Sequence, residues 1–255
     1  MGSGMITTVK DLGELPRSYN ILSHVEIPDE SVLPIKTKKI QVIPSEHETI
    51  IKQIAMEYSP NKNERYLYRY EPAIVFLLNT GMRGGELLAL GRKSIIPYQG
   101  RRGVNITQTL SRVKDKSKST EQTTKLILTP PKYSKSVRII PLNREVEFSL
   151  SCMLELYGRN YFDEDLILSL QNGKVPNIQS LEKTLKKICQ RAGLPEYRLH
   201  SLRHTFAANM IRQTKNMAEV KEVAEILGDG YEVVLKTYLH AEDEKKINLV
   251  DALIA

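Results

Sequence analysis

The sequence predicts a mainly helical α+β fold with a small antiparallel β-sheet. Apolar residues recur at helical spacing over about 45–90 and again over about 144–239. Between these two blocks, over about 104–142, short runs of β-favouring residues are separated by polar loops. The chain has 255 residues, of which 41% are hydrophobic, and this is ample for a packed core. The middle of the chain is therefore expected to form the sheet, and the flanking blocks the helices.

Three helices are expected in the first block. The sequence Ser-Glu-His-Glu at 45–48 has the form of a capping box and opens a helix that extends to about residue 58. A second helix over about 64–79 ends at a Thr-Gly pair. A short third helix is expected over about 84–90.

Strands are expected over about 104–110, 126–128 and 137–142. Residues 104–110 alternate between apolar and polar side chains, although Gln108 interrupts the apolar face. The hairpin signal Asn172-Gly173 follows another apolar run, so the sequence also allows one further short strand pair. After the sheet, helices are expected over about 144–157, 178–192, 201–213, 218–227 and 231–239.

The expected organisation has one folded domain over 41–255, which ends in an apolar tail at 247–254. Residues 5–40 show little periodicity, and three prolines interrupt their polar sequence. We therefore expect them to form a linker or the remnant of a preceding domain. Residues 1–4 are interpreted as an expression scar before a second methionine.

Composition excludes several classes of protein. The two cysteines, Cys152 and Cys189, form no C-x-x-C pair, so neither a disulfide framework nor a tightly bound zinc ion is expected. A reducing, intracellular setting is favoured. No stretch approaches the roughly 18 to 20 apolar residues of a membrane span, and the first residues contain no apolar signal core.

Positive charge is concentrated in the strand region. The formal net charge of the chain is +7, whereas residues 101–138 contain ten basic and two acidic residues. A basic, strand-like segment suits a partner with a regular array of negative charge, such as a nucleic-acid backbone. A solvated loop that charge keeps soluble would have the same composition. The residues expected to contact DNA are Arg101, Arg102, Arg112, Lys114, Lys116, Lys118, Lys135 and Arg138.

Three separated clusters carry residues suited to chemistry at a phosphate. Arg83 lies beside glycines at the start of a short helix, three residues before Glu86. His200 and Arg203 share a helix face because they are three residues apart. Tyr238 comes near the end of the last expected helix. Taken singly, each cluster also has a structural interpretation. Arg83 could pair with Glu86 at a turn, His200 and Arg203 could support the structure of their helix, and Tyr238 could be an amphipathic packing residue.

Taken together, the clusters resemble the catalytic domain of the tyrosine recombinases, the phage-integrase family. The resemblance runs from about Gln41 to the C-terminus and lies in the order T-G-M-R-x-x-E-L-L-A-L, H-x-L-R-H-T-F-A and L-G-x-x8-Y-x-H. The segment over 130–142, P-P-K-Y-S-K-S-V-R-I-I-P-L, also looks like the β-hairpin of the family. Lys132 is therefore the match for the catalytic lysine, and Lys135 is the fallback.

The resemblance implies DNA strand exchange through a 3′-phosphotyrosine intermediate, without a metal or other cofactor. Tyr238 would attack the scissile phosphate. A phenol with a pKa of about 10 needs a base, for which His200 is the candidate. Arg83 and Arg203 would hold the non-bridging oxygens, and Lys132 would protonate the departing 5′-oxygen.

Further residues are expected to support these groups, and Glu86 would do so by holding Arg83 in place. After the Leu-Gly pair the family commonly has His, sometimes Trp, which donates a hydrogen bond to the phosphate, whereas this chain has Asp229. An ionised carboxylate cannot donate and would repel the phosphate. Asp229 would then point away and orient His204, His240 or a lysine, or be protonated near DNA, or keep the activity low. We predict the supporting role.

The resemblance also implies partners. Family members usually carry a helical core-binding domain ahead of the catalytic domain. Residues 5–40 are too few to form one, so the resemblance implies a truncated chain in which they are a linker or the remnant of a truncated N-terminal DNA-binding domain. The terminal helix of the family often docks on a neighbouring protomer. The tail at 247–254 would therefore either fold onto its own core or join protomers into a homo-tetramer on double-stranded DNA. Accessory DNA-bending proteins and a cytoplasmic, nucleoid-associated bacterial location are further expectations.

The expected function is that of a site-specific integrase of a phage or conjugative transposon. Two alternatives remain. A type IB topoisomerase would share the chemistry of these residues but relax supercoils without a partner site. A catalytically decayed DNA-binding domain, marked by Asp229, would form no covalent adduct with DNA.

Overall fold

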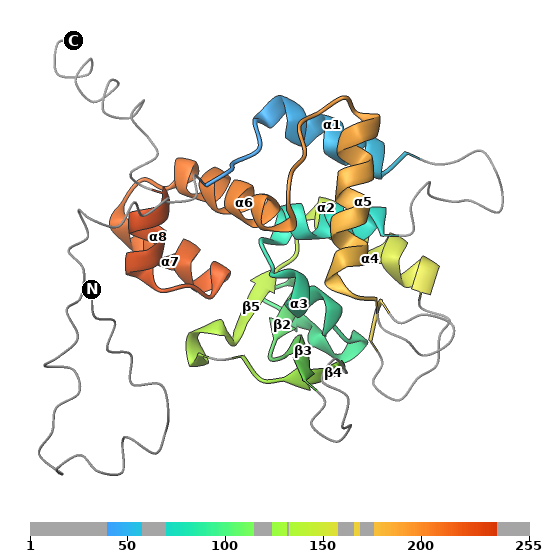
Figure 1. The fold of residues 1–255 in the computed structure, drawn as a ribbon. Coiled ribbons are helices and arrows are strands. Elements are labelled where there is room, and N and C mark those ends of the chain that lie inside the picture. Colours follow the sequence, from blue (N-terminus) through green and yellow to red (C-terminus); the bar gives the residue numbers. More distant parts are fainter. Residues whose placement is uncertain are drawn as a thin grey trace, which may run out of the picture. The chain divides into compact units, whose positions relative to one another are not determined.

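The structure, a computed structural model, describes residues 40–57, 70–114, 124–131, 133–157, 166–168 and 176–238. In this part of the chain helices combine with two small antiparallel sheets, which confirms the predicted mainly helical α+β fold (Figure 1). The helices are α1 (Ser45–Ala55), α2 (Glu71–Thr80), α3 (Gly84–Leu88), α4 (Arg144–Tyr157), α5 (Ile178–Arg191), α6 (Leu199–Gln213), α7 (Met217–Leu227) and α8 (Tyr231–Tyr238). The strands are β1 (Ile95–Tyr98), β2 (Arg101–Ile106), β3 (Thr109–Lys114), β4 (Thr124–Thr129) and β5 (Arg138–Pro141), with short 3-10 helices η3 (Arg92–Ser94) and η4 (Ser134–Ser136).

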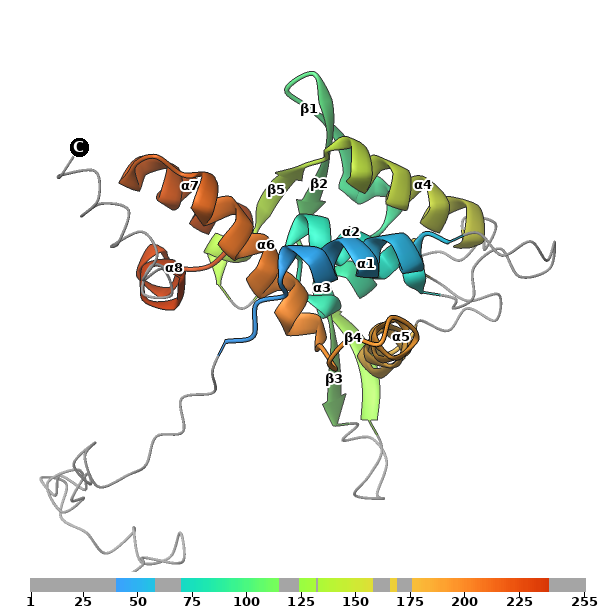
Figure 2. The ribbon, with the colours of Figure 1, turned by 90° about the horizontal axis from the view of Figure 1, so that it is seen from above.

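Helix α2 lies at the centre of the larger hydrophobic core. All of its residues except Asn79 are buried, and it packs against α1, α4, α5 and α6. Figure 2 shows these four helices gathered around it. A helix that is apolar on every side is typical of such a core position. The turn that follows α2 therefore begins at the end of a helix that is packed on all sides.

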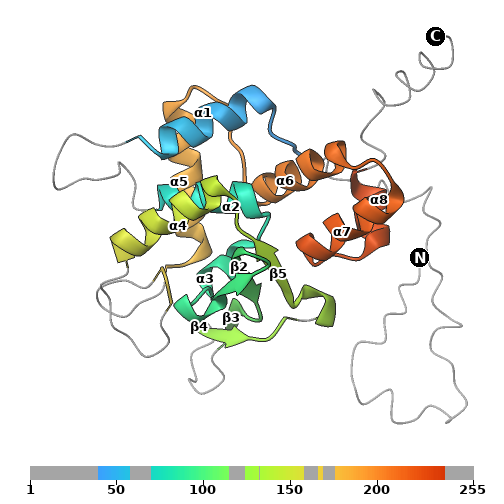
Figure 3. The same ribbon diagram turned by 180° about the vertical axis from the view of Figure 1, so that it is seen from behind.

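A second, smaller core joins α6, α7 and α8. These helices form a group at one side of the domain (Figure 3). Helix α7 ends at Gly228, which adopts the left-handed conformation with φ of 67°. The short turn to α8 brings the last residue of α8, Tyr238, back against α6, where its side chain is 5% exposed.

The described residues form two sheets where one was expected. The predicted strand over 104–110 is divided, because β2 ends at Ile106 and pairs with β1 and β5, whereas β3 begins at Thr109 and pairs with β4. Thr107 and Gln108 connect the two sheets. The interruption that Gln108 makes in the alternation therefore marks the point at which the chain changes its partner strand.

Several other expectations are corrected. Strand β1 was not expected. It contains Pro97, which a strand accepts at a sheet edge, and β1 is an edge strand that pairs with β2. Helix α1 begins at Ser45, but Pro44 is its N-cap and no side chain caps it. Helix α2 begins at Glu71 rather than near 64. The segments 1–39, 58–69, 169–175 and 239–255 lie outside the described residues and include the predicted scar, linker, hairpin and tail.

The described helices are short relative to a bilayer. Among the residues that the structure describes, no helix combines the length and the apolar character needed to span a membrane.

Candidate active site

The turn between α2 and α3 brings Arg83 against α6. Gly81 ends α2 in the left-handed conformation with φ of 63°, and a Cβ atom at this position would lie 2.4 Å from Cδ1 of Phe206. Glycine is therefore required both by the backbone conformation and by the close approach of α6. Arg83 follows as the N-cap of α3, with its side chain 38% exposed.

Arg203, on α6, is almost completely buried and is bound by two main-chain oxygens. Its Nη1 donates to the carbonyl oxygen of Gly81 at 2.7 Å, and its Nη2 donates to that of Leu227 at 2.8 Å. Both carbonyls lie at C-terminal ends of helices, where free carbonyls and the helix dipole favour a cation. Arg203 therefore ties the ends of α2 and α7 to α6.

Asp229 joins the two arginines. Its Oδ1 accepts a hydrogen bond from Nη2 of Arg83 at 2.5 Å, and its Oδ2 accepts one from Nη2 of Arg203 at 2.6 Å. Its side chain is 19% exposed. The structure thus corrects the expectation that Asp229 points away: its carboxylate lies between the two guanidiniums and forms an ion pair with each. His240, one of the residues it was expected to orient, lies outside the described residues.

A buried ion pair between Glu86 and Arg138 lies behind Arg83. Nη1 and Nη2 of Arg138 donate to the two carboxylate oxygens of Glu86 at 3.0 and 2.9 Å. Glu86 also accepts hydrogen bonds from the main-chain nitrogen and Nη1 of Arg83, at 2.8 and 3.0 Å. Burial alone would raise the pKa of the Glu86 carboxyl, but Arg138 and then Arg83 outweigh burial and lower it. The expectation that Arg138 contacts DNA is corrected, because its guanidinium is buried and bound by Glu86.

Tyr238 meets His204 rather than His200. Nδ1 of His204 lies 2.6 Å from Oη of Tyr238. The ring of His200 packs edge-on against that of His204, with centroids 4.5 Å apart and an interplanar angle of 84°. The sequence signal for this contact was the position of His204 one helical turn after His200, on the same face of α6. His204 is therefore the histidine that contacts the predicted nucleophile.

Burial keeps the tyrosine and histidine neutral. It raises the pKa of Tyr238 to about 12, although the charge of Arg203 opposes this effect. Burial, and then the charges of His200 and Arg203, lower the pKa of His204 to about 4. Burial and then the two arginines also lower the pKa of His200. At neutral pH a neutral phenol and a neutral imidazole therefore share the hydrogen bond.

Acidification is expected to destabilise the protein through His204. Its pKa is about 4 in the folded chain, whereas an exposed histidine has a pKa of 6.5, so between these pH values the unfolded chain binds the proton and the folded chain does not. The stability that the neutral ring contributes is therefore present above about pH 6.5 and is lost as the pH falls toward about 4. His200 acts in the same direction. Thermal unfolding over this range is expected to show a midpoint that falls with pH, and less steeply in His204→Gln.

The matched control for this measurement is His47→Gln. His47 also binds a tyrosine hydroxyl, that of Tyr197, at 2.7 Å, but it lies on α1 away from the arginine pair. The slope of this variant is the reference with which that of His204→Gln is compared. A wild-type slope in His204→Gln would contradict the assignment to His204.

The other predicted DNA contacts differ in their surroundings. Arg101, Arg112 and Lys135 are exposed, and Arg102 is exposed but donates through Nε to Glu147 at 3.0 Å. Among the described residues, no three His, Cys, Asp or Glu side chains are grouped as metal ligands would be. The predicted site residues that lie outside the described residues are Lys116, Lys118, Lys132 and His240, and of Lys114 only the main chain in β3 is described.

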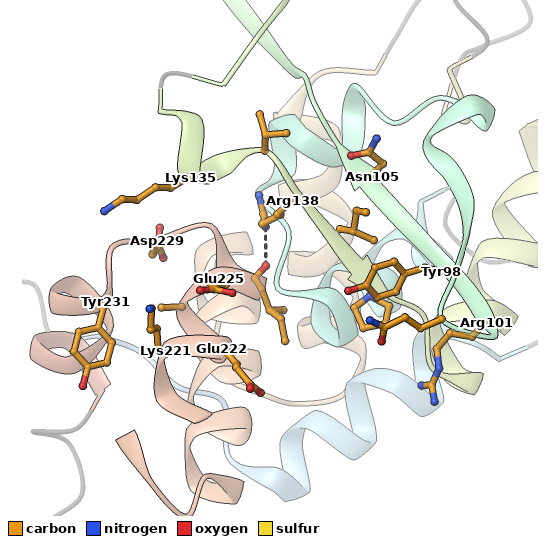
Figure 4. A pocket seen from close by; sticks show the side chains of 16 residues that line it. Tyr98, Arg101, Asn105, Lys135, Arg138, Lys221, Glu222, Glu225, Asp229 and Tyr231 are labelled. Carbon is orange, nitrogen blue, oxygen red and sulfur yellow. Dashed lines mark hydrogen bonds between the residues drawn. The ribbon is translucent and has the colours of Figure 1, made fainter. Parts of the chain in front are cut away.

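An open groove of about 1080 Å³ lies beside Asp229 and Arg138. It runs between β5 and α7, with Lys135 and Asp229 toward one end and Tyr98 and Arg101 toward the other (Figure 4). Asp229 is part of its lining, so the carboxylate that contacts Arg83 and Arg203 is open to the groove. Its lining carries both acidic and basic side chains.

The fold and the arrangement of these residues define the class of protein, the catalytic domain of tyrosine recombinases. The model of the phage integrase family matches residues 42–245, and the chain belongs to this family. It is 26% identical over 201 residues to a XerC-like tyrosine recombinase of Caldanaerobacter subterraneus subsp. tengcongensis. The match covers 73% of this chain and 49% of the relative, so the chain spans about half the length of the curated relative that it matches.

Solved structures show the same fold. The chain is similar to the Tn1549 transposon integrase in complex with transposon right end DNA, with a TM-score of 0.64 and 22% identity over 88% of this chain and 70% of that one. It is also similar to the XerH recombinase bound to palindromic difH substrate, with a TM-score of 0.59 and 18% identity over 86% and 54% of the two chains. For the XerA recombinase the TM-score is 0.58 and the identity 17%, over 89% and 68%.

Proposed function

We propose that this chain is the catalytic domain of a site-specific DNA recombinase that cleaves and rejoins strands through a 3′-phosphotyrosine intermediate. The observation that carries the proposal is the convergence of Arg83 and Arg203 on one anion, the Asp229 carboxylate. Two guanidiniums directed at one oxyanion stabilise the charge that develops on phosphorus during phosphoryl transfer. Tyr238, on α8, supplies the nucleophile.

The proposed reaction conserves the energy of the phosphodiester. Oη of Tyr238 forms a bond to the scissile phosphorus while the bond from phosphorus to the 5′-oxygen breaks. Arg83 and Arg203 bind the non-bridging oxygens. The phenolic proton passes to a base, and the 5′-oxygen receives a proton from an acid. A 5′-hydroxyl then attacks the phosphotyrosine and reverses the chemistry with the same or another strand.

His204 is the better candidate for the base than His200, which the sequence indicated. A base has to reach the proton that it accepts, and Nδ1 of His204 lies 2.6 Å from Oη of Tyr238. The pKa values of the pair, about 12 and about 4, keep the proton on the resting tyrosine. The proton moves only as Oη bonds to phosphorus, because that bond makes the phenolic oxygen strongly acidic. The ring of His200 packs against that of His204.

The general acid is proposed to be Lys132, with Lys135 as the alternative. Lys135 is exposed on η4 and lies toward the same end of the groove as Asp229 (Figure 4). Lys132, which belongs to the segment between β4 and η4, lies outside the described residues. A chemical experiment is therefore needed to decide which of the two lysines is the general acid.

A substrate with sulfur in place of the departing 5′-oxygen is expected to identify the acid. A thiolate leaves without protonation, so a variant that lacks the acid regains cleavage on this substrate. Lys132→Ala is expected to lose about a hundredfold in cleavage of ordinary DNA and to recover with the sulfur-containing DNA. Lys135→Ala is the matched control and is expected to show neither effect. Recovery in Lys135→Ala instead would transfer the role to Lys135.

Double-stranded DNA is the proposed partner, and integration or excision of a mobile element is the proposed role. The Tn1549 integrase and XerH, which have the same fold, are bound to DNA in their structures. We further propose assembly into a tetramer through residues 247–254, accessory DNA-bending proteins and a cytoplasmic, nucleoid-associated location. Sedimentation of the full chain and of residues 1–242 on target DNA tests the tail, because equal assembly states would remove that role.

Trapping on nicked DNA tests the proposed function. A duplex nicked close to the scissile phosphate loses a short fragment after cleavage, which prevents rejoining and leaves the chain covalently bound. Denaturing electrophoresis is expected to show a protein–DNA adduct that protease digests. No adduct would favour the decayed DNA-binding domain. Relaxation of a supercoiled plasmid without a recombination site would favour the type IB topoisomerase.

A further inference from the structure

We propose that Asp229 is a built-in competitor of the scissile phosphate. In the structure its carboxylate takes the position between Arg83 and Arg203 that a phosphodiester has to occupy, and it keeps the two guanidiniums together until the phosphodiester displaces it. The inference rests on the proposed function and assigns to Asp229 a positioning role that motif spacing does not indicate.

The hydrogen bonds of the two arginines define this position. Nη1 of Arg203 donates to the carbonyl oxygen of Gly81, and Nη1 of Arg83 donates to Glu86. The Nη2 atoms of both arginines donate to Asp229, at 2.5 and 2.6 Å. Nη2 of Arg203 donates to the carbonyl oxygen of Leu227 as well. An oxyanion that enters the position between the two Nη2 atoms therefore has to take over the hydrogen bonds that Asp229 accepts.

A carboxylate resembles a phosphodiester in the arrangement of its charged oxygens. Each group presents two equivalent oxygens that share one negative charge. In the structure one oxygen of Asp229 contacts each arginine, which is the contact that two non-bridging phosphate oxygens would make. The carboxylate and the phosphodiester therefore exclude each other.

Asp229 is more accessible than Arg203, the buried member of the two arginines. Its side chain is 19% exposed and lines the open groove (Figure 4), whereas Arg203 is 3% exposed. An anion that enters from the groove meets Asp229 before it meets Arg203. The preceding residue, Gly228, is packed tightly, since a Cβ atom there would lie 2.9 Å from Nη1 of Arg138. We therefore expect the exchange to occur by rotation of the Asp229 side chain, with the backbone in place.

Asp229 also balances charge. Arg138 and Arg83 share the carboxylate of Glu86, whereas the buried guanidinium of Arg203 contacts Asp229. Without this carboxylate, two like charges would face each other at the position it occupies. Removal of its charge is therefore expected to destabilise the protein and to strengthen anion binding at the same time. A residue with only a structural role would produce the first effect without the second.

The consequence is selectivity for firmly bound DNA. The apparent affinity of a phosphate is reduced by the fraction of time for which the carboxylate occupies the position. A phosphate with few other contacts does not displace Asp229, whereas a scissile phosphate held by a whole protein–DNA interface does. Asp229 thereby restricts cleavage to DNA that is bound along the rest of the domain.

Titration with inorganic phosphate at constant ionic strength tests this proposal. Thermal unfolding is followed for the wild type, Asp229→Asn and Glu225→Gln. Asp229→Asn is expected to unfold at a lower temperature than the wild type without phosphate, and to bind phosphate about tenfold more tightly or better, so that phosphate raises its midpoint further. Equal phosphate affinity in the wild type and Asp229→Asn would overturn the proposal.

The controls separate charge from position. Glu225→Gln removes the same charge from an exposed residue that lines the same groove, and it is expected to respond to phosphate as the wild type does. Asp229→Glu keeps the charge and is expected to exclude phosphate; a gain like that of Asp229→Asn would count against the proposal. If Asp229→Asn is unfolded in buffer, phosphate is expected to restore its folding, and failure to do so would also count against it.

Adduct formation on nicked DNA gives a second readout. Asp229→Asn is expected to reach half of its maximal rate at a lower DNA concentration than the wild type, whereas a lower rate with unchanged half-saturation would contradict the proposal. The phosphate titration does not require cleavage. If Asp229→Asn binds phosphate more tightly but the wild type forms no adduct, the proposal for Asp229 stands and the proposed recombinase function is wrong. If the wild type forms the adduct but Asp229→Asn does not bind phosphate more tightly, the recombinase function stands and the proposal for Asp229 is wrong.

Discussion

Replacement of Tyr238 by phenylalanine is expected to abolish the covalent adduct with DNA and to leave the fold intact. The substitution removes Oη, the atom that forms the bond to phosphorus, so cleavage has no nucleophile. The ring remains in the core that α6, α7 and α8 share. Among the described residues the hydrogen bond that is lost is the one to His204, and such a bond contributes about 1 kcal/mol to stability.

Denaturing electrophoresis after incubation with nicked DNA measures this result, and thermal unfolding reports on the fold. Tyr231→Phe is the matched control, because Tyr231 is the first residue of the same helix and also loses a phenolic hydroxyl. This control is expected to form the adduct as the wild type does. An adduct in Tyr238→Phe would place the nucleophile elsewhere in the chain.

Of the proposed substitutions, Arg138→Met is expected to lower the free energy of unfolding the most. The substitution leaves the buried carboxylate of Glu86 with Arg83 alone and removes the donors to the carbonyl oxygens of Ile226 and Ser136. Removal of one partner of a buried ion pair costs about 3–5 kcal/mol. At about 2–4 °C per kcal/mol for a domain of this size, the unfolding midpoint is expected to fall by roughly 6–20 °C.

Arg101→Met is the matched control for this prediction. It removes the same charge from an exposed side chain and is expected to change stability by less than about 0.5 kcal/mol. Glu86→Gln combined with Arg138→Met is expected to destabilise less than the sum of the two single variants, because they interrupt the same pair. An unchanged midpoint in Arg138→Met, with weaker DNA binding, would restore the DNA contact that the sequence indicated.

The fold could be predicted wherever local pattern decides it. Helical spacing of apolar residues located α4, α5 and α7 to within a residue or two, because each of these helices buries one face along its whole length. The division of the predicted strand into β2 and β3, and the edge strand β1, could not be predicted. Strand pairing depends on partners that lie tens of residues away, and β2 pairs with β5 across the whole of β3 and β4.

The residue types of the site could also be predicted, whereas their contacts could not. Motif order singled out Arg83, Arg203 and Tyr238, and the structure places both arginines on one carboxylate; their catalytic roles remain predictions. The histidine that meets Tyr238 differs from the one expected, because neighbouring turns of α6 present two candidates and only the position of α8 selects between them.

By itself, the sequence determined which residues are available and on which local element each one lies, because helical and strand periodicities are short-range properties of the backbone. Only the tertiary structure decided which opposite charges meet. It buried Arg138 against Glu86 and brought Asp229 between two guanidiniums. The physical reason is that a charge removed from water must find its partner among whatever groups the packing of distant elements brings near.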